Sequence, residues 1–279
     1  MFVSSSAMMA IFIAITGLCF GSFITMASHR LAIFNKSEDI SIRDLILKGS
    51  SCPSCNKQLK LQHLFPIFSW LFYKGKCGFC ANKISIRYPL IEISTALLFL
   101  GVFWILGPVI NAKLILTLSI FVFLIIMVVV DLEHYFIPDI TQIIVLALIL
   151  AYHLILPDSH NLSYYLFSAA GLFMFGIILW YGFFLVTKRH GIGIDDIKFF
   201  TLAGFMLGLD KLMIFMILSG LLGTLFGAIW TRLKKDDTFP FAPALVVSFM
   251  ICILFQINYI ETLGNLLYWF EKVVTKTAY

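Results

Sequence analysis

Long apolar runs, separated by short polar segments, make up most of this chain. A helix needs about 20 predominantly apolar residues to cross the hydrocarbon core of a bilayer, and runs near that length recur. The pattern predicts an all-α fold, a polytopic membrane helix bundle of roughly eight spans. We expect the spans at residues 7–27, 88–107, 113–131, 138–156, 163–186, 195–209, 212–230 and 240–258. The first run lacks a small-residue cleavage site after a short core, which favours a retained helix over a cleaved signal peptide.

Composition supports the membrane interpretation. Hydrophobic residues make up 61% of the chain and charged residues 13%, and the mean hydropathy is +0.98. These values exclude an ordinary soluble domain. The net charge of +5 comes from the polar segments between spans, without a basic stripe interleaved with aromatic residues. We therefore expect a lipid bilayer as surroundings and no nucleic-acid partner.

Positive charge is concentrated in one loop. Ten of the twenty Lys and Arg residues lie between Arg30 and Arg87, and the basic residues at 188–189 and 232–235 fall on the same side. The positive-inside rule makes this side cytoplasmic and the N-terminus external. The chain is then expected to comprise a first transmembrane helix (1–30), a cytoplasmic cysteine loop (31–87), a transmembrane bundle (88–258) and a C-terminal tail (259–279).

Two CxxC pairs lie in the large loop, Cys52 with Cys55 and Cys77 with Cys80. Four thiolates at this spacing can form a closed tetrahedral zinc site, which predicts a zinc-knuckle loop in which zinc is structural. The loop has too few apolar residues for an unaided core, so a metal would supply the missing stability. Two disulfides or four free thiols are the alternatives, and a cytoplasmic position argues against disulfides.

Two aspartates at the ends of apolar runs are the candidate catalytic residues. Asp131 ends the third predicted span and Asp196 begins the sixth, and both fall on the cytoplasmic face. Carboxylates near a membrane are costly, and two that meet can share a proton and activate water. Each one alone could equally be an interfacial cap. Residues expected to tune the site, or to be simply solvated, are Asp195, Lys198, Glu133, Gly193, His134 and Asp139.

Several motifs follow one another along nearly the whole chain. They are Gly21-Ser22-Phe23 with His29-Arg30-Leu31, the two CxxC pairs, Pro66–Leu71, Ile84–Glu92, Asp131–Asp139, Asp195–Lys198 and Phe239–Pro243. In this order they resemble the bacterial type IV prepilin peptidase family. One departure concerns the second aspartate motif: the family has Gly before the catalytic Asp, whereas this chain has Asp195. Alignment on Lys198 gives the catalytic role to Asp196.

The resemblance implies a polytopic aspartic endopeptidase of the bacterial inner membrane. Its substrates would be prepilins or pseudopilins, cut after a basic leader at the cytoplasmic membrane face. One aspartate would take a proton from water while the other, protonated, donates to the scissile carbonyl. Many members also methylate the new N-terminal amine with S-adenosylmethionine, and since this chain keeps the cysteine loop, we expect both activities. The sequence does not indicate the oligomeric state.

Two other functions are open at this stage. A polytopic metal or solute transporter could use zinc in the loop and line an ion path with its acidic residues. Both aspartates, however, lie at one membrane face and not at the midplane, where transporter sites lie. A preflagellin-type or other intramembrane aspartic peptidase is the second alternative, and the large cysteine loop weighs against it.

Overall fold

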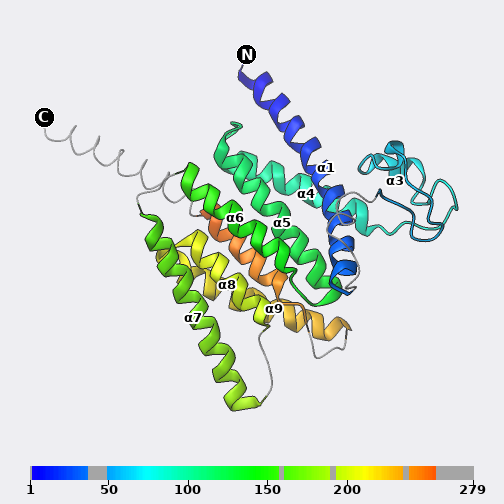
Figure 1. Ribbon diagram of the computed structural model, residues 1–279. Helices are drawn as coiled ribbons and strands as arrows, with labels where there is room; N and C mark the ends of the chain where they lie inside the picture. The colour runs from blue at the N-terminus through cyan, green and yellow to red at the C-terminus, as the bar shows by residue number, and fades with distance from the viewer. Residues whose placement is uncertain (1, 37–48, 157–159, 189–192, 235–238, 256–279) are drawn as a thin grey trace, which may run out of the picture.

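The computed structural model describes residues 2–36, 49–156, 160–188, 193–234 and 239–255. Within them the chain is helical and has no strands, only two isolated bridges, Ser51 with Gln58 and Lys76 with Lys83. The all-α prediction is therefore confirmed for this part of the chain. The long helices are α1 (Phe2–Lys36), α4 (Arg87–Ile105), α5 (Ala112–His134), α6 (Asp139–Ile155), α7 (Leu162–Thr187), α8 (Ile194–Leu207), α9 (Leu209–Lys234) and a last helix, Ala242–Phe255 (Figure 1).

A helix occupies each predicted span, but five of these helices are long and apolar enough to cross a membrane by themselves: α1, α4, α5, α7 and α9. With 17 residues, α6 measures about 25 Å, and α8, with 14, about 21 Å. Both lengths fall short of the roughly 30 Å hydrocarbon core. The length of the helices thus supports a multipass membrane protein and not the full count of eight. The predicted tail (259–279) lies outside the described residues.

Helix α5 forms the centre of the bundle. Its most apolar window is 67% buried, against 17–39% for the other four long helices. α5 packs against α1, α4 and α6, and α8 packs against α6, α7 and α9. The largest fully buried side chains between these helices are aromatic: Phe99, Phe103, Phe121, Phe199, Phe215 and Phe249. The core therefore fixes the end of α5 relative to the start of α8, the two places that carry the predicted catalytic residues.

Helix α1 lies closely along α4 because two glycines of α1 face it. A Cβ added at Gly17 would lie 2.7 Å from the Ala96 Cα, and one added at Gly21 would lie 2.5 Å from the Glu92 Cα. Backbones approach this closely in membrane bundles when small residues line the contact. The glycines of α1 therefore set the position of α4, and with it that of the cysteine loop that precedes α4.

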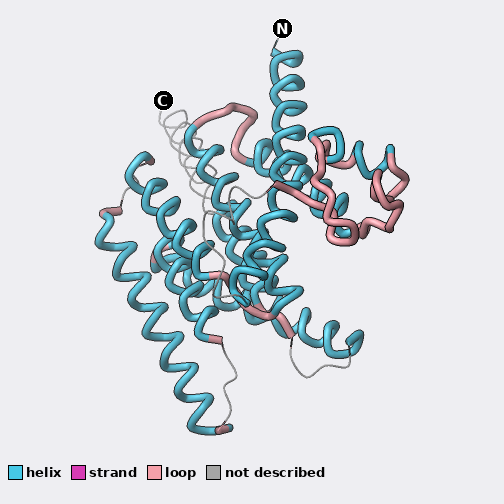
Figure 2. The backbone as a smooth tube through the Cα atoms, turned by 45° about the vertical axis from the view of Figure 1, so that its right-hand side comes forward, coloured by secondary structure: helices cyan, strands magenta, loops and turns pink. Residues whose placement is uncertain are grey.

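The cysteine module, residues 49–86, is a compact unit with two short helical pieces, η1 (Leu61–His63) and α3 (Phe68–Phe72). Figures 1 and 2 show it on the flank of the bundle formed by α1 and α4, with α3 on the upper side of the module. The module is attached to the bundle through the start of α4, which it joins directly in sequence.

Candidate active site

Asp131 lies in the last turns of α5, where its carboxylate is directed into the protein. Its side chain is buried, with the residue only 6% exposed. The Ala242 N–H donates a hydrogen bond of 2.8 Å to Asp131 Oδ2. Ala242 is the first residue of the last helix, so this N–H has no partner within that helix. A helix N-terminus favours a carboxylate, and this contact holds Asp131 in place.

Asp196 lies in the first turn of α8 and is half-buried. The Gly193 N–H donates to Asp196 Oδ2 over 3.2 Å, and the Asp196 N–H donates to the Gly193 carbonyl over 3.2 Å. A Cβ at position 193 would lie 3.2 Å from the same carboxylate oxygen. Glycine at this position therefore leaves room for the carboxylate next to its own helix start, which gives a physical reason for a residue that the sequence singled out.

The structure brings the predicted catalytic aspartates together. Asp196 is close enough to Asp131 and to Asp195 for electrostatic repulsion, and Asp131 is likewise repelled by Asp195. Two carboxylates that repel each other in a partly buried site are costly to ionise together, so the favoured state has one protonated and one ionised. This is the chemical requirement for an acid–base pair that activates water.

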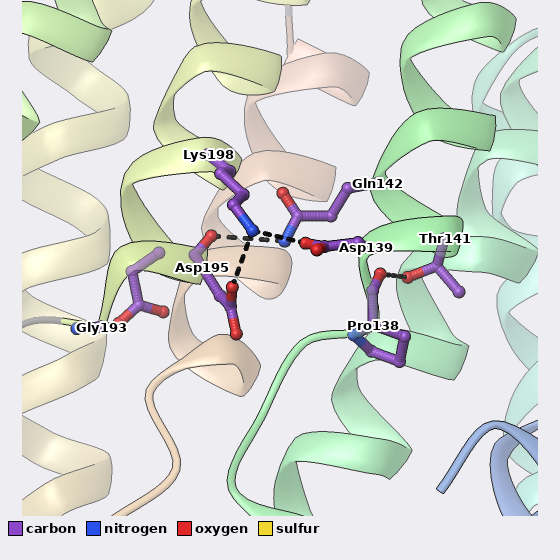
Figure 3. A network of polar contacts seen from close by, with 8 residues as sticks. Pro138, Asp139, Thr141, Gln142, Gly193, Asp195 and Lys198 are labelled. Carbon is purple, nitrogen blue, oxygen red and sulfur yellow. Dashed lines mark hydrogen bonds and ion pairs between the residues drawn. The ribbon is translucent and has the colours of Figure 1, made fainter. Parts of the chain in front are cut away.

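Lys198 connects the starts of α6 and α8 (Figure 3). Its Nζ lies 2.5 Å from Asp139 Oδ1 and 3.2 Å from Asp195 Oδ1. Gln142 adds a bond of 3.4 Å from its side-chain amide to the Asp195 carbonyl. Asp195 is thus held by a lysine, whereas Asp131 and Asp196 accept bonds from backbone N–H groups. This difference supports the assignment of the second catalytic role to Asp196.

Within the described residues, the ion pairs of Glu133 and His134 are with residues other than Asp131 and Asp196. Glu133 forms an ion pair with Arg87, with Nε to Oε1 at 2.6 Å, and the same guanidinium donates to Ser28 Oγ over 3.3 Å. The His134 Nε2 lies 4.0 Å from Glu133 Oε2. This group therefore joins the ends of α1, α4 and α5, and so helps to place the turn of α5 that carries Asp131.

The four loop cysteines form one cluster. Their Sγ atoms all lie within 4.8 Å of one another, and Cys52 Sγ and Cys80 Sγ are 3.9 Å apart. A tetrahedron with Zn–S bonds of about 2.3 Å has edges of about 3.8 Å, so the cluster fits zinc. The Cys55 N–H lowers the pKa of the Cys52 thiol to about 6, which favours the thiolate. All four are free thiols, and none is paired in a disulfide.

The two halves of the cluster repeat one backbone pattern. Cys52 donates its N–H to the Lys57 carbonyl and Cys77 donates to the Asn82 carbonyl, over 3.0 and 2.8 Å. The residue after each CxxC pair, Asn56 or Ala81, has a positive φ of 54° or 56°. A tight turn of this kind aims backbone N–H groups and both sulfurs of a pair at a single point, as a metal site with four thiolates requires.

Several functional contacts were missed from the sequence. The Ala242 N–H that holds Asp131 was noted only as part of a proline-containing motif, and Gln142 and Arg87 were given no role. A helix start has unpaired N–H groups, so the prolines around Ala242 were an available signal for a helix start. Nothing in the sequence shows which carboxylate such a start would face.

Comparisons with known proteins cover most of the chain. Residues 15–106 match the bacterial peptidase A24 N-terminal domain, and residues 118–228 match the type IV leader peptidase family. The second match includes Asp131 and Asp196, and the first includes all four cysteines. No solved structure matched the chain.

Three curated relatives, all named prepilin leader peptidase/N-methyltransferase, illustrate the similarity. The Bacillus subtilis protein is 34% identical over 244 residues, which cover 86% of this chain and 92% of the relative. The Pseudomonas aeruginosa protein is 32% identical over 260 residues, with 85% and 87% covered. The Neisseria gonorrhoeae protein is 32% identical over 253 residues, with 84% and 86% covered.

Proposed function

The chain belongs to the type IV leader peptidase family, and from this membership we propose that it is a prepilin leader peptidase and N-methyltransferase. Its substrates are prepilins or pseudopilins, from which it removes the basic leader peptide at the membrane face. The observation that carries the proposal is the approach of Asp131 and Asp196 in a chain whose similarity to such enzymes extends over both aspartates. Nothing in the site favours a transporter.

The mechanism follows from two carboxylates that share one proton. The ionised carboxylate of the Asp131–Asp196 pair takes a proton from a water molecule, which attacks the scissile carbonyl. The protonated carboxylate donates to the carbonyl oxygen as the tetrahedral intermediate forms, and the pair then protonates the leaving amine. Neither a covalent intermediate nor the cysteine cluster takes part in this step. Gly193 and Ala242 hold the two carboxylates through their N–H groups.

Methylation of the new N-terminal amine is the second proposed activity, with S-adenosylmethionine as donor. We assign none of the described residues to donor binding. Zinc, held by Cys52, Cys55, Cys77 and Cys80, stabilises the module structurally, since four thiolates leave no open position for water. The oligomeric state is left open.

We place the protein in the bacterial inner membrane, with roughly eight crossings, an external N-terminus and a cytoplasmic active site and cysteine loop. The functional parts follow the predicted boundaries: the first helix (1–30), the cysteine loop (31–87), the peptidase bundle (88–258) and the tail (259–279). The location of ten of twenty Lys and Arg residues between Arg30 and Arg87 supports this orientation.

Co-expression with a candidate prepilin in a host without its own leader peptidase tests the function. We expect the mature pilin to lack its leader and to carry the additional mass of one methylene group at its N-terminus, measured by mass spectrometry. Asp131→Asn and Asp196→Asn should each lower cleavage by at least about a hundredfold while protein levels stay normal. Full processing by either variant would refute the assignment.

A further inference from the structure

The cysteine module exposes an apolar surface that its own fold does not cover. Phe65, Phe68, Leu71 and Phe72 are 62%, 68%, 59% and 79% exposed, and we call these four residues the aromatic face. Phe68, Leu71 and Phe72 belong to α3, which has no buried residue at all. Scattered exposed apolar residues are ordinary, but adjacent large side chains on one small unit indicate a binding surface.

One hydrogen bond to α4 sets the depth of the aromatic face relative to the membrane, and a second one holds α3 within the module. The Ile67 N–H, immediately before α3, donates to Glu92 Oε2 over 2.7 Å, and Trp70 Nε1 donates to the Ile84 carbonyl over 3.3 Å. Glu92 lies five residues beyond Arg87, the first residue of the membrane-spanning helix α4, which is about 7.5 Å along the helix. The start of α3 is thus held level with the second turn of a membrane span.

That depth is the level of the bilayer interface. Amphipathic segments lie there with their apolar side chains about 5–10 Å below the headgroup boundary. α4 exposes an apolar stripe of its own over the same turns and beyond, formed by Leu90, Ile93 and Leu97. In Figures 1 and 2 the module lies on the flank of the bundle, and α3 is on the side of the module that points toward the N-terminus of α1, not toward the end of α5.

The charge of the module is suited to an anionic surface. Between Gly49 and Ile91 the chain has no Asp or Glu. The same stretch carries exposed lysines at positions 57, 60, 74, 76 and 83 together with Arg87, so it stays positive even with the two negative charges of a four-thiolate zinc centre. Lysines close to an anionic leaflet each strengthen the attraction of the protein to the membrane.

We propose that the cysteine module docks on the anionic lipid surface, with its aromatic face inserted among the acyl chains and its lysines at the headgroups. The module would then be held at the interface by lipid as well as by Glu92. Insertion requires only that α4 spans the bilayer, so it is independent of peptidase activity.

Lipid suits this face better than a protein partner does. The prepilin must reach Asp131 and Asp196, which lie at the end of α5 and the start of α8, whereas the module occupies the α1–α4 flank (Figure 1). A second copy of the chain would bring two positively charged modules together, which is unfavourable unless their charges are screened.

The test replaces Phe72 with the photo-reactive analogue benzoyl-phenylalanine in the full-length, zinc-loaded protein, reconstituted in nanodiscs that contain phosphatidylglycerol. The matched control carries the same analogue at Gln58, which is exposed on the same module and outside the aromatic face. Each variant must elute from size-exclusion chromatography as the parent protein does, which shows that it is folded. Since burial of one Phe side chain changes a partition ratio by roughly tenfold or more, we expect at least that excess of lipid adduct at position 72.

Irradiation distinguishes the possible occupants. Lipid adducts at position 72 that fall when phosphatidylglycerol is replaced by phosphatidylcholine would support docking by both the aromatic face and the lysines. Equal lipid adducts at positions 72 and 58, adducts mainly to added prepilin, adducts to a second copy, or no adduct at position 72 would each overturn it. Phe68→Ser combined with Phe72→Ser should lower the hydrogen-exchange protection of residues 64–72 in nanodiscs. The protection of residues 49–58 in the same nanodiscs should stay unchanged.

Discussion

At the residue scale, the partners of the three clustered carboxylates differ in kind. Asp131 and Asp196 each accept one backbone N–H, from Ala242 and Gly193, whereas Asp195 faces the ammonium of Lys198. A lysine neutralises a carboxylate and keeps it from acting as an acid, while one N–H bond fixes the position of a carboxylate without adding a full positive charge beside it. The extra acid of this chain is thus bound into the contact between α6 and α8, and we expect that it does not replace Asp131 or Asp196.

A glycine at position 195, as in the family pattern, should therefore be tolerated. Asp195→Gly removes a negative charge that acts on both Asp131 and Asp196, and it leaves Lys198 paired with Asp139. We expect prepilin cleavage within about tenfold of the parent, because no group that touches the substrate is lost. The measurement is the rate of leader removal in membranes. An inactive Asp195→Gly beside an active Asp196→Asn would transfer the catalytic role to Asp195.

Opposite shifts of the pH–activity profile should follow from the charges around the pair. The charged groups that contact it or its neighbours are Asp195 and Lys198 on α8 and Asp139 on α6. Because cleavage needs one ionised carboxylate, removal of a negative charge in Asp195→Asn makes ionisation easier and moves the acidic limb to lower pH. Loss of the positive charge in Lys198→Met moves it to higher pH, in each case by about half a unit.

Lys113→Met is the matched control for Lys198→Met. Lys113 lies 18 residues before Asp131 on α5, a distance of about 27 Å along the helix, so the same change of charge should leave the acidic limb in place. A purely structural role of Lys198 would lower the rate at every pH without shifting the limb. Shifts of Asp195→Asn and Lys198→Met in the same direction would contradict the electrostatic explanation.

At the scale of elements, the contact between α1 and α4 depends on the absence of side chains at Gly17 and Gly21. Gly21→Ala adds a Cβ 2.5 Å from the backbone of α4, and neither backbone can move without disturbing the buried Glu92. We expect a loss of about 1–3 kcal/mol of stability, measured as a lower thermal midpoint in detergent. Gly101→Ala on α4 meets nothing within 4 Å and should be neutral or slightly stabilising. Equal midpoints for the two variants would show that the helices are not close-packed at Gly21.

The cysteine module should depend on metal, and the aspartate pair should not. Purified protein is expected to hold about one zinc per chain, which is lost when Cys52, Cys55, Cys77 and Cys80 are all replaced by Ser. Because both aspartates lie on α5 and α8, outside the module, the Ser variant should lose methylation more readily than cleavage. Zinc content by metal analysis, together with the mass of the mature pilin, measures both effects. Metal-free parent protein, or equal loss of both activities, would count against this separation.

At the scale of the whole molecule, the periodicity and the motifs of the sequence predicted the helices and the cysteine cluster. They did not predict the individual contacts between side chains. Apolar length placed every long helix, and the CxxC spacing predicted the cluster of four cysteines. The sequence could not show that Asp131 faces Ala242, or that Lys198 joins α6 to α8, because these contacts link residues 111 and 59 positions apart through packing. Two residues of the aromatic face, Phe68 and Leu71, belong to the Pro66–Leu71 motif, but their exposure is a property of the folded module and not of the sequence.

Helix lengths leave the number of crossings open, but the direction of the helices constrains it. α6 and α8 run parallel, since Lys198 meets Asp139 at their starts and His153 lies 2.9 Å from the Phe205 carbonyl toward their ends. α7 packs on α8 and runs in the opposite direction: a Cβ at Gly176 would meet Ile197, and one at Gly208 would meet Tyr164. α7 is long enough to cross the bilayer, whereas α6 and α8 are shorter and run opposite to it. We therefore expect α6 and α8 to cross in the reverse direction to α7.

The same alternation continues to the last helix, which gives the final prediction. Gly223 of α9 packs against Phe241, and Phe215 packs against Phe249 with ring centroids 6.3 Å apart, so the helix Ala242–Phe255 runs antiparallel to α9. If the N-terminus is external, reporter fusions after Lys188 and Lys234 should be cytoplasmic, and fusions after Gly208 and Phe255 should be external. Alkaline phosphatase, active only outside, and green fluorescent protein, fluorescent only inside, give opposite readings at each point. We expect the short helices to cross because the protein around them replaces lipid. A cytoplasmic reading at Gly208 would contradict this and would mean that α8 enters the bundle without crossing the bilayer.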